Sequence, residues 1–464
     1  MANRKPFLKR YLNRLGAACI FSLFFIGNAW SGSPGTGTQK KDIDPKIKSE
    51  TPSILSQYLV QAALNNPELE AAFQRWKAAL EKIPQVKALP DPRFTFSYFV
   101  RSIETKTGPQ RAKLGIAQTF PWFGKLALKG DMAMQDANAI KAEYDTIKLR
   151  IFYQVKSTYY EYAYLARAIV IAREDVELLT FLEGIARTRY AAGKTPYTDL
   201  MKIQIERDKL KDRLKTLEDL KRPIVAKLLA TMNLPVGTKL PLPQGIPIMV
   251  TSLTDKELLE ELPKHNPRIK RYVYLEAREK AGIGLAKKDF YPDLTLGVQT
   301  IITDPASNRM INDRGEDPII ASFSFNLPIW WNKQRAAVRQ AHARRLSAKK
   351  KNISIKQNLL SDMQLALFNY RDARRRINLY KNTLIPRAKQ ALEVTLKAFQ
   401  SGIRSSLDLI DAEKTLLEFD LSYTRALADQ AQRFAELEMI LGKKIPCTIY
   451  KPLMPELRPL DITH

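Results

Sequence analysis

Cysteine and histidine are nearly absent from this chain of 464 residues, which holds two cysteines and three histidines. Once the N-terminal segment described below is removed, Cys447 is left alone, so an intrachain disulfide is excluded. His265, His342 and His464 lie far apart in the sequence, which argues against a metal site built from His and Cys. Nucleophile-elbow and phosphate-loop motifs are missing as well. We therefore expect no enzyme and no bound cofactor.

Long apolar runs are also scarce. The clearest one, 15–26, follows a basic stretch and precedes the small residues Ala29 and Ser31, which is the pattern of a cleavable export signal. We predict a signal peptide over 1–31 and a linker over 32–52. Lipid attachment at Cys19 is a weaker alternative, because the apolar run continues past it. No later stretch approaches the ~18 apolar residues of a spanning helix, so we expect an exported chain without a helical membrane anchor.

Acidic residues are outnumbered, with 48 Asp and Glu against 75 Lys and Arg, a formal charge of +27. Five of these charges lie in the signal, leaving +22 for the exported chain. Such an excess often indicates nucleic acid as a partner, but export argues against it. The cations also alternate with acids, as in DKLKDRLKTLEDLKR (208–222), which is typical of a solvated helical face. An affinity for anionic lipopolysaccharide or for an acidic protein stays open.

The chain repeats itself in order, at a spacing of roughly 200–209 residues, which indicates a duplicated half. The Pro-rich stretch LPVGTKLPLPQGIP (234–247) is the natural linker between the halves. We predict a first repeat over 53–233, a linker over 234–251, a second repeat over 252–446 and a tail over 447–464. The matching segments are LNNPELEAAF with KHNPRIKRYV, LPDPRFTFSY with FYPDLTLGVQ, QTFPWFGK with FNLPIWWNK, YAAGKTPYTDL with FQSGIRSSLDL, and LATMNLPVG with EMILGKKIP.

Each half predicts two short strands, because apolar side chains alternate with more polar ones. Polar, turn-rich connections over 101–111 and 303–318 separate the strands of each pair. The alternating apolar residues are Phe94, Phe96, Tyr98 and Val100 in the first half, and Leu294, Leu296, Val298, Phe323, Phe325 and Leu327 in the second.

The second strand of each half ends at a proline, Pro121 or Pro328, beside aromatic residues. In an exported protein, such a cluster at the end of an alternating strand is typical of a membrane-interface belt. A place in the protein core is the alternative. The four aromatics are Trp122, Phe123, Trp330 and Trp331.

Beyond each belt the chain is predicted to be helical for a long way. Residues Lys125 to Ala191 contain no proline, and a helix of that length would span roughly 100 Å. After the second tip, apolar residues recur at steps of three and four from Leu409 to Ala426, which is coiled-coil spacing. The predicted fold is therefore mainly α with a small membrane β part.

A membrane sheet must close on itself, because lipid cannot satisfy open strand edges. Four strands per chain are too few to close. Two chains would give eight strands and a barrel filled by side chains, whereas three would give twelve and a water-filled lumen. We expect a homotrimeric tube, with β structure in the membrane and helices below it.

On these segments the sequence resembles the TolC family of outer-membrane efflux ducts over nearly all of the exported chain. QTFPWFGK, YPDLTLGV and the tips RYAAGKTPYTDL and FQSGIRSSLDLIDAE carry the resemblance. It implies a trimeric 12-stranded β-barrel in outer-membrane lipid, continuing into a long periplasmic α-helical barrel. Cargo would arrive from an inner-membrane pump through a periplasmic adaptor. FPWFGK resembles the branch that serves heavy-metal and related cation exporters, so the cargo would be heavy-metal cations or drugs. The alternatives are a duct for type I protein secretion and an exported coiled-coil structural protein.

The two tips are the candidate functional regions. Gly193 and Gly402 would each let a helix reverse, because glycine adopts the left-handed conformation at little cost. With Lys194 and Ile403 they would face the adaptor.

The resemblance places Asp408 and Asp411, three residues apart and so on one helical face, at the narrow entrance. In three copies they would form two carboxylate rings that select cations. The alternative for these residues and for Asp199 is helix capping.

The resemblance also suggests a periplasmic gate. Arg404 matches the position that links the second hairpin to the first, and Asp199 beside Thr198 matches its partner. Phe399 stands where the best-known member of the family has a tyrosine, so any gate bond through that hydroxyl is missing. Ordinary surface charges are the alternative for Asp199 and Arg404.

Overall fold

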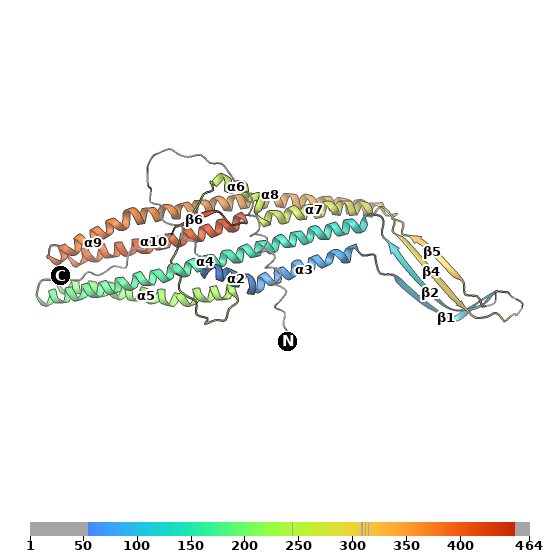
Figure 1. The fold of residues 1–464 in the computed structure, drawn as a ribbon, viewed down its shortest axis with the longest axis horizontal. Helices are drawn as coiled ribbons and strands as arrows, with labels where there is room; N and C mark the ends of the chain where they lie inside the picture. The colour runs from blue at the N-terminus through green and yellow to red at the C-terminus, as the bar shows by residue number, and fades with distance from the viewer. Residues whose placement is uncertain (1–53, 244, 308–309, 311, 314, 451–464) are drawn as a thin grey trace, which may run out of the picture. The chain divides into compact units, whose positions relative to one another are not determined.

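The computed structural model describes residues 54–450, apart from residues 244, 308, 309, 311 and 314. The predicted signal peptide (1–31) with Cys19, the predicted linker (32–52) and residues 451–464 of the predicted tail lie outside the described residues. The described chain is mainly helical, as the sequence predicts (Figure 1).

Helices and strands follow one another in a mixed order. The helices are α2 (Ile54–Asn65), α3 (Pro67–Lys87), α4 (Lys125–Ala191), α5 (Tyr197–Met232), α6 (Asp255–His265), α7 (Pro267–Lys288), α8 (Trp331–Leu379), the π-helical turn η1 (Tyr380–Leu384), α9 (Ile385–Gln400) and α10 (Ser406–Leu441). The strands are β1 (Arg93–Thr105), β2 (Gly108–Phe120), β3 (Ile248–Thr251), β4 (Leu294–Thr303), β5 (Ile319–Phe325) and β6 (Cys447–Tyr450).

Helix α4 has 67 residues, and its ends coincide with the predicted proline-free stretch. At 1.5 Å per residue it extends about 100 Å and links the sheet to the first hairpin tip. It contacts α3 and α7 near the sheet, and α5 and α10 further along (Figure 1). In the second half, α8 and α9 cover the same route but are interrupted by η1. The interruption ends two residues before Pro386, which has no N–H to continue the helical ladder.

Four antiparallel strands form one sheet in the order β1-β2-β4-β5. Both predicted strand pairs are therefore confirmed. β2 ends at Phe120, directly before Pro121, whereas β5 ends at Phe325, a few residues before Pro328. Among the described residues, β1 and β5 each have a strand partner on one side alone, so the sheet of a single chain is open.

The sheet has one apolar face, because the register places the alternating apolar residues side by side. Phe94 lies opposite Ile116, Ile116 opposite Val298, and Leu296 opposite Phe323. This face is exposed: 68% of Phe94 and 67% of Phe323 is accessible. The other face is polar; there the hydroxyls of Thr119 and Thr295 are hydrogen-bonded at 2.9 Å. Such a sheet requires an apolar environment on one side and a polar one on the other.

The first polar connection differs from the prediction. Most of 101–111 is strand, since β1 continues to Thr105 and β2 begins at Gly108. The turn is short because Gly108 adopts a φ of +137° and the Thr105 hydroxyl donates to its carbonyl at 2.6 Å. The second connection, between β4 and β5, is a longer loop, as expected.

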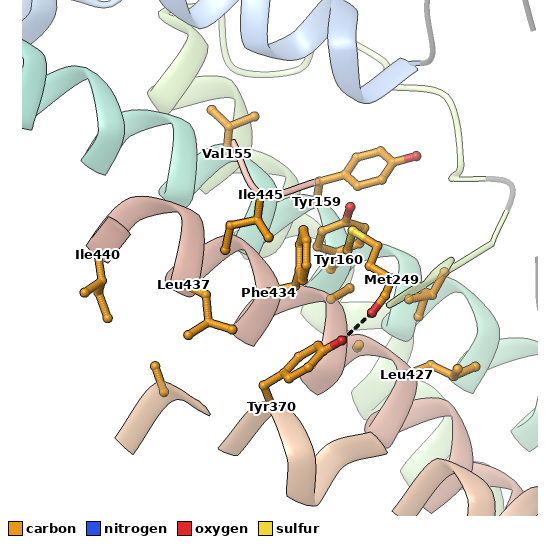
Figure 2. Close-up of a cluster of buried hydrophobic side chains, with 14 of the residues drawn as sticks. Val155, Tyr159, Tyr160, Met249, Tyr370, Leu427, Phe434, Leu437, Ile440 and Ile445 are labelled. Carbon is orange, nitrogen blue, oxygen red and sulfur yellow. Dashed lines mark hydrogen bonds between the residues drawn. The ribbon is translucent and has the colours of Figure 1, made fainter. Parts of the chain in front are cut away.

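Two short strands, β3 and β6, were not predicted; they fall within the predicted linker (234–251) and tail (447–464). They pair with each other, and β3 is held against the helices by hydrogen bonds to Met249. The Tyr370 hydroxyl donates to the Met249 carbonyl at 2.7 Å, as Figure 2 shows. The fully buried Gln430 also donates to that carbonyl and accepts from the Met249 N–H. The surrounding core includes Tyr160, Phe434 and Leu437 (Figure 2).

Asn66 and Asn266 begin α3 and α7 in the same way. Each side-chain oxygen accepts from two backbone N–H groups of the following turn. Each amide also donates to the end of a long helix, Asn66 to Thr231 O at 2.8 Å and Asn266 to Ile440 O at 2.6 Å. The Asn-Pro pairs of the two halves therefore occupy equivalent local environments.

Candidate functional site at the hairpin tips and the sheet-helix junction

Both hairpin tips are closed by the same pattern of backbone hydrogen bonds. At the first tip, Gly193 N donates to Tyr190 O and Lys194 N to Arg189 O, each at 2.9 Å. At the second, Gly402 N donates to Phe399 O at 3.0 Å and Ile403 N to Ala398 O at 2.9 Å. This is the Schellman motif, in which the residue after the helix is left-handed. Gly193 and Gly402 have φ of +68° and +83°, so the turn-forming role predicted for them is confirmed.

A carboxylate lies in the third position of each helix that follows a tip. Asp408 and the N-cap Ser405 form a capping box in α10, each side chain accepting from the backbone N–H of the other. Asp199 holds the same position in α5, whose N-cap Pro196 gives no side-chain cap. The spacing of six residues from glycine to aspartate is thus the length of the turn, and the capping alternative describes Asp408 well.

Arg404, Asp408 and Asp411 lie together beside the second tip. A guanidinium nitrogen of Arg404 is 3.9 Å from a carboxylate oxygen of Asp408. The three side chains line a hollow of about 310 Å³ together with residues of α9. In the part of the chain that the structure describes, Asp199 has no ion pair, and Thr198 beside it is exposed. The structure of one chain therefore places Arg404 against Asp408.

Arg189, which the sequence analysis did not single out, connects the two tips. Its guanidinium donates from Nη1 to the carbonyls of Phe399 at 2.6 Å and Gln400 at 3.2 Å, at the end of α9. It also lies over the Phe399 ring, 5.0 Å from the ring centre, and bonds to Thr195 Oγ1 at 3.2 Å. A cation is favoured there because the last carbonyls of a helix carry partial negative charge. Phe399 is only 1% exposed, so its ring is a packing residue of the tip.

A second polar cluster holds the first hairpin together. Glu183 of α4 accepts from Gln204 at 2.9 Å and from the guanidinium groups of Arg187 and Arg207. The hydrogen bond from Gln204 and these two cations keep the pKa of Glu183 below its ordinary value. Glu183 therefore stays ionised at neutral pH and fixes α4 against α5.

The four belt aromatics differ in their surroundings. Phe123 is 84% exposed, Trp330 72% and Trp331 60%. Trp122 is half-buried and stacks on Tyr291, with ring centres 5.1 Å apart and planes at 11°. Trp122 therefore packs against another residue of the chain, whereas the other three are exposed, and the membrane-interface belt stays a prediction.

The stacking of Trp122 belongs to a junction where β2 leads into α4 and α7 leads into β4. The Lys125 ammonium, buried at the start of α4, lies 2.8 Å from Asp293 Oδ1 and 3.2 Å from Tyr291 O. Asp293 also accepts from Trp122 N at 2.8 Å. The segments PWFGK and YPDL, noted in the sequence as separate motifs, thus meet each other in space.

Two kinds of feature are lacking within residues 54–450 as described. No helix there is both long enough and apolar enough to cross a membrane. No group of three or more His, Cys, Asp or Glu side chains is placed to hold a metal ion.

Long paired helices, reversed at two capped tips and joined to a sheet with one apolar exposed face, define the class of outer-membrane channel proteins. The family described as "Outer membrane efflux protein" matches residues 58–229 and again 258–443, so the chain belongs to this family and is an outer-membrane efflux duct. The resemblance found in the sequence is confirmed. The helical part of the chain lies on the periplasmic side of the outer membrane.

Individual relatives cover most of the chain. "Cobalt-zinc-cadmium resistance protein CzcC" from Cupriavidus metallidurans is 24% identical over 94% of this chain and all of its own length. "Toxin and drug export protein A" from Aggregatibacter actinomycetemcomitans is 24% identical over 78% of this chain and 80% of its own. Among solved structures, the outer-membrane channel OprN matches with a TM-score of 0.72 at 17% identity, covering 90% of this chain and 98% of OprN.

Proposed function

We propose that three copies of the chain form one exit duct, with a shared 12-stranded barrel in the outer membrane and a helical barrel in the periplasm. The observation that carries this proposal is the open four-stranded sheet with its exposed apolar face. Lipid would cover that face, and neighbouring copies would pair with β1 and β5. The duct would pass cargo without catalysing a reaction.

The assembly is tested by expressing the chain and separating the outer membrane. We expect a heat-modifiable band that migrates as a trimer before boiling and as a monomer afterwards. Native mass spectrometry in detergent should give three copies. A monomer in the aqueous fraction, or a dimer in the membrane, would contradict the proposal.

We further propose that the duct receives cargo from a periplasmic adaptor and an inner-membrane pump, and that the cargo is heavy-metal cations or drugs. The similarity to a cobalt-zinc-cadmium resistance protein supports metal cargo, and the similarity to a toxin and drug export protein supports drug cargo. Deleting the gene and measuring the growth-inhibiting concentrations of zinc, cadmium and several drugs separates these cargos.

The two halves, 53–233 and 252–446, are proposed to be copies of one ancestral unit. The double match to one family, the shared hydrogen bonds of Asn66 and Asn266, and the two identical tip motifs support this duplication. The tips, with Gly193, Lys194, Gly402 and Ile403, would then present six similar turns per trimer to the adaptor. Ile403 is 78% exposed in the single chain and so is free to contact a partner.

Asp408 and Asp411 are proposed to form the carboxylate rings of the entrance. Asparagine is the informative substitution, because its side-chain oxygen retains the capping interaction while the charge is lost. For Asp408→Asn with Asp411→Asn we expect cation selectivity in single-channel recordings to fall about tenfold, since six carboxylates leave one constriction. Asp212→Asn with Asp219→Asn, two exposed carboxylates of α5, is the matched control. Equal selectivity in both double variants would contradict the ring.

Arg404, Asp199, Thr198 and Phe399 are proposed to belong to the periplasmic gate. Arg404→Ser removes a charge that would pair across the entrance, so we expect the resting conductance in planar bilayers to rise about tenfold, since a hydrogen bond to a charged group contributes about 1.5 kcal/mol or more. Lys397→Ser is a suitable control, because that exposed cation pairs within α9 with Glu393. A resting conductance unchanged from the wild type would remove Arg404 from the gate.

A further inference from the structure

The junction between β2 and β4 is closed within one chain by residues of two motifs. Lys125, the first residue of α4 and five residues after the end of β2, pairs with Asp293, directly before the start of β4. Only 7% of the Lys125 side chain is exposed. Trp122 stacks on Tyr291, whose carbonyl accepts a hydrogen bond from Lys125. An ion pair and an aromatic contact thus fasten two neighbouring strands where they leave the sheet.

The same residue types recur at the two outer strands. The segment LPDPRF (89–94) places Asp91 just before β1, as YPDL places Asp293 before β4. The segment PIWWNK (328–333) places Lys333 in the first turn of α8, as PWFGK places Lys125 at the start of α4. Trp330 then corresponds to Trp122, at the same distance before the lysine.

Within the described part of a single chain, these outer residues do not make the ion pair and the aromatic stacking seen at the inner junction. Asp91 and Lys333 are exposed, and within the described part of the chain neither makes an ion pair. Trp330 and Leu89, which correspond to the stacked Trp122 and Tyr291, are 72% and 46% exposed. Asp91 precedes β1 and Lys333 follows β5 in the chain. Among the described residues, these two strands form the edges of the sheet (Figure 1).

The directions of the strands make a contact between β5 of one copy and β1 of the next equivalent to the contact between β2 and β4 within one copy. The strands alternate in direction across the sheet, so β5 of one copy and β1 of the next would also be antiparallel. The end of β5 would then lie beside the start of β1, as the end of β2 lies beside the start of β4. Lys333 and Asp91 would therefore meet at the seam between copies.

We propose that Lys333 of one copy forms an ion pair with Asp91 of the next, with Trp330 packed against Leu89 of that copy. The pair would seal the base of the barrel at each of the three seams. This inference rests on the proposed trimer and adds to it the residues that set the contact and its register.

Cross-linking tests the contact directly. Asp91→Cys and Lys333→Cys are combined in a chain whose Cys19 and Cys447 are replaced by serine, and a short bis-maleimide is added to the membranes. We expect covalent dimers and trimers on a denaturing gel. The control joins Asp91→Cys to Lys349→Cys, since Lys349 is exposed but lies about 24 Å further along α8. Monomers alone in the first variant, or equal ladders in both, would overturn the pairing.

Charge exchange tests the interaction. Lys333→Asp places two acids at each seam, so the trimer should dissociate at a temperature lower by about 5 °C or more. Asp91→Lys should do the same, and the doubly exchanged variant should recover most of the loss. Lys349→Asp should leave the dissociation temperature unchanged.

The outcomes separate this inference from the proposed function. If native mass spectrometry of the wild type shows no trimer, the proposed assembly fails. If the trimer forms but exchange restores nothing and no cross-link appears, the Lys333–Asp91 seam alone is wrong.

Discussion

Lys125→Met is expected to destabilise the folded chain by about 3 kcal/mol or more, because removing one partner of a buried ion pair leaves the other charge uncompensated. The Lys125 ammonium is 2.8 Å from Asp293 and 3.6 Å from Asp289. With methionine, the carboxylate of Asp293 keeps one hydrogen bond, from the N–H of Trp122, and the more distant charge of Lys129. The loss should appear as a lower thermal midpoint of the helical circular dichroism signal and as a weaker heat-modifiable band.

Lys129→Met provides the control, because Lys129 is exposed, makes no ion pair within the described residues and acts on Asp293 through its more distant charge alone. Lys125→Met combined with Asp293→Leu should recover much of the stability, since an apolar pair of similar size replaces the ionic one. Equal midpoints for Lys125→Met and Lys129→Met would show that the junction pair contributes little.

The Lys125–Asp293 pair makes the stability of the folded chain depend on pH. Partial burial works to raise the pKa of Asp293, but Lys125 and the Trp122 N–H outweigh it and hold the pKa below its ordinary value. Asp293 therefore contributes stability above its unfolded pKa of about 4, and this contribution is lost as the pH falls through the lower folded pKa. The Lys125→Met variant should lose less stability than the wild type over the same acidic pH range, as measured by the thermal midpoint.

Several elements could be predicted from local sequence because the signal lies within the element. Helix α4 is free of proline and ends two residues before Gly193, so both of its limits are visible in the sequence. The strands β1 and β4 alternate apolar and polar residues because one face of the sheet is apolar. The two tips could be located by glycine, whose positive φ few other residues adopt at little cost.

Other elements and contacts could not be predicted from local sequence, because the residues that pair with them are distant in the chain. β3 and β6 have four residues each, too few for a clear alternation, and Ile248 pairs with Tyr450. Arg189 donates to backbone carbonyl groups, which every residue type has, on residues 210 and 211 positions away. The sequence allows a capping role for Asp408, whereas the contact of Asp408 with Arg404 is visible in the structure alone.

Arg189→Met is expected to uncouple the two hairpins and so raise the resting conductance of the duct. Arg189 donates two hydrogen bonds to the end of α9 and lies over the Phe399 ring, and a charged hydrogen bond contributes about 1.5–3 kcal/mol. Losing about 2 kcal/mol of coupling would multiply the population of separated hairpins about 30-fold. Single-channel recording at low voltage measures this increase.

Two comparisons separate coupling from general destabilisation. Arg187→Met removes a cation two residues earlier that pairs with Glu183 of its own helix, so it should leave the conductance unchanged. Arg189→Lys keeps the charge but not the flat guanidinium that reaches two carbonyls and stacks on an aromatic ring, so it should fall between the wild type and Arg189→Met. The thermal midpoint of the helices should change little in all three variants, because the contacts broken lie in the last turns. If Arg187→Met opens the duct as far as Arg189→Met does, the contact between the tips does not control the entrance, and charge near the tip is the determining property.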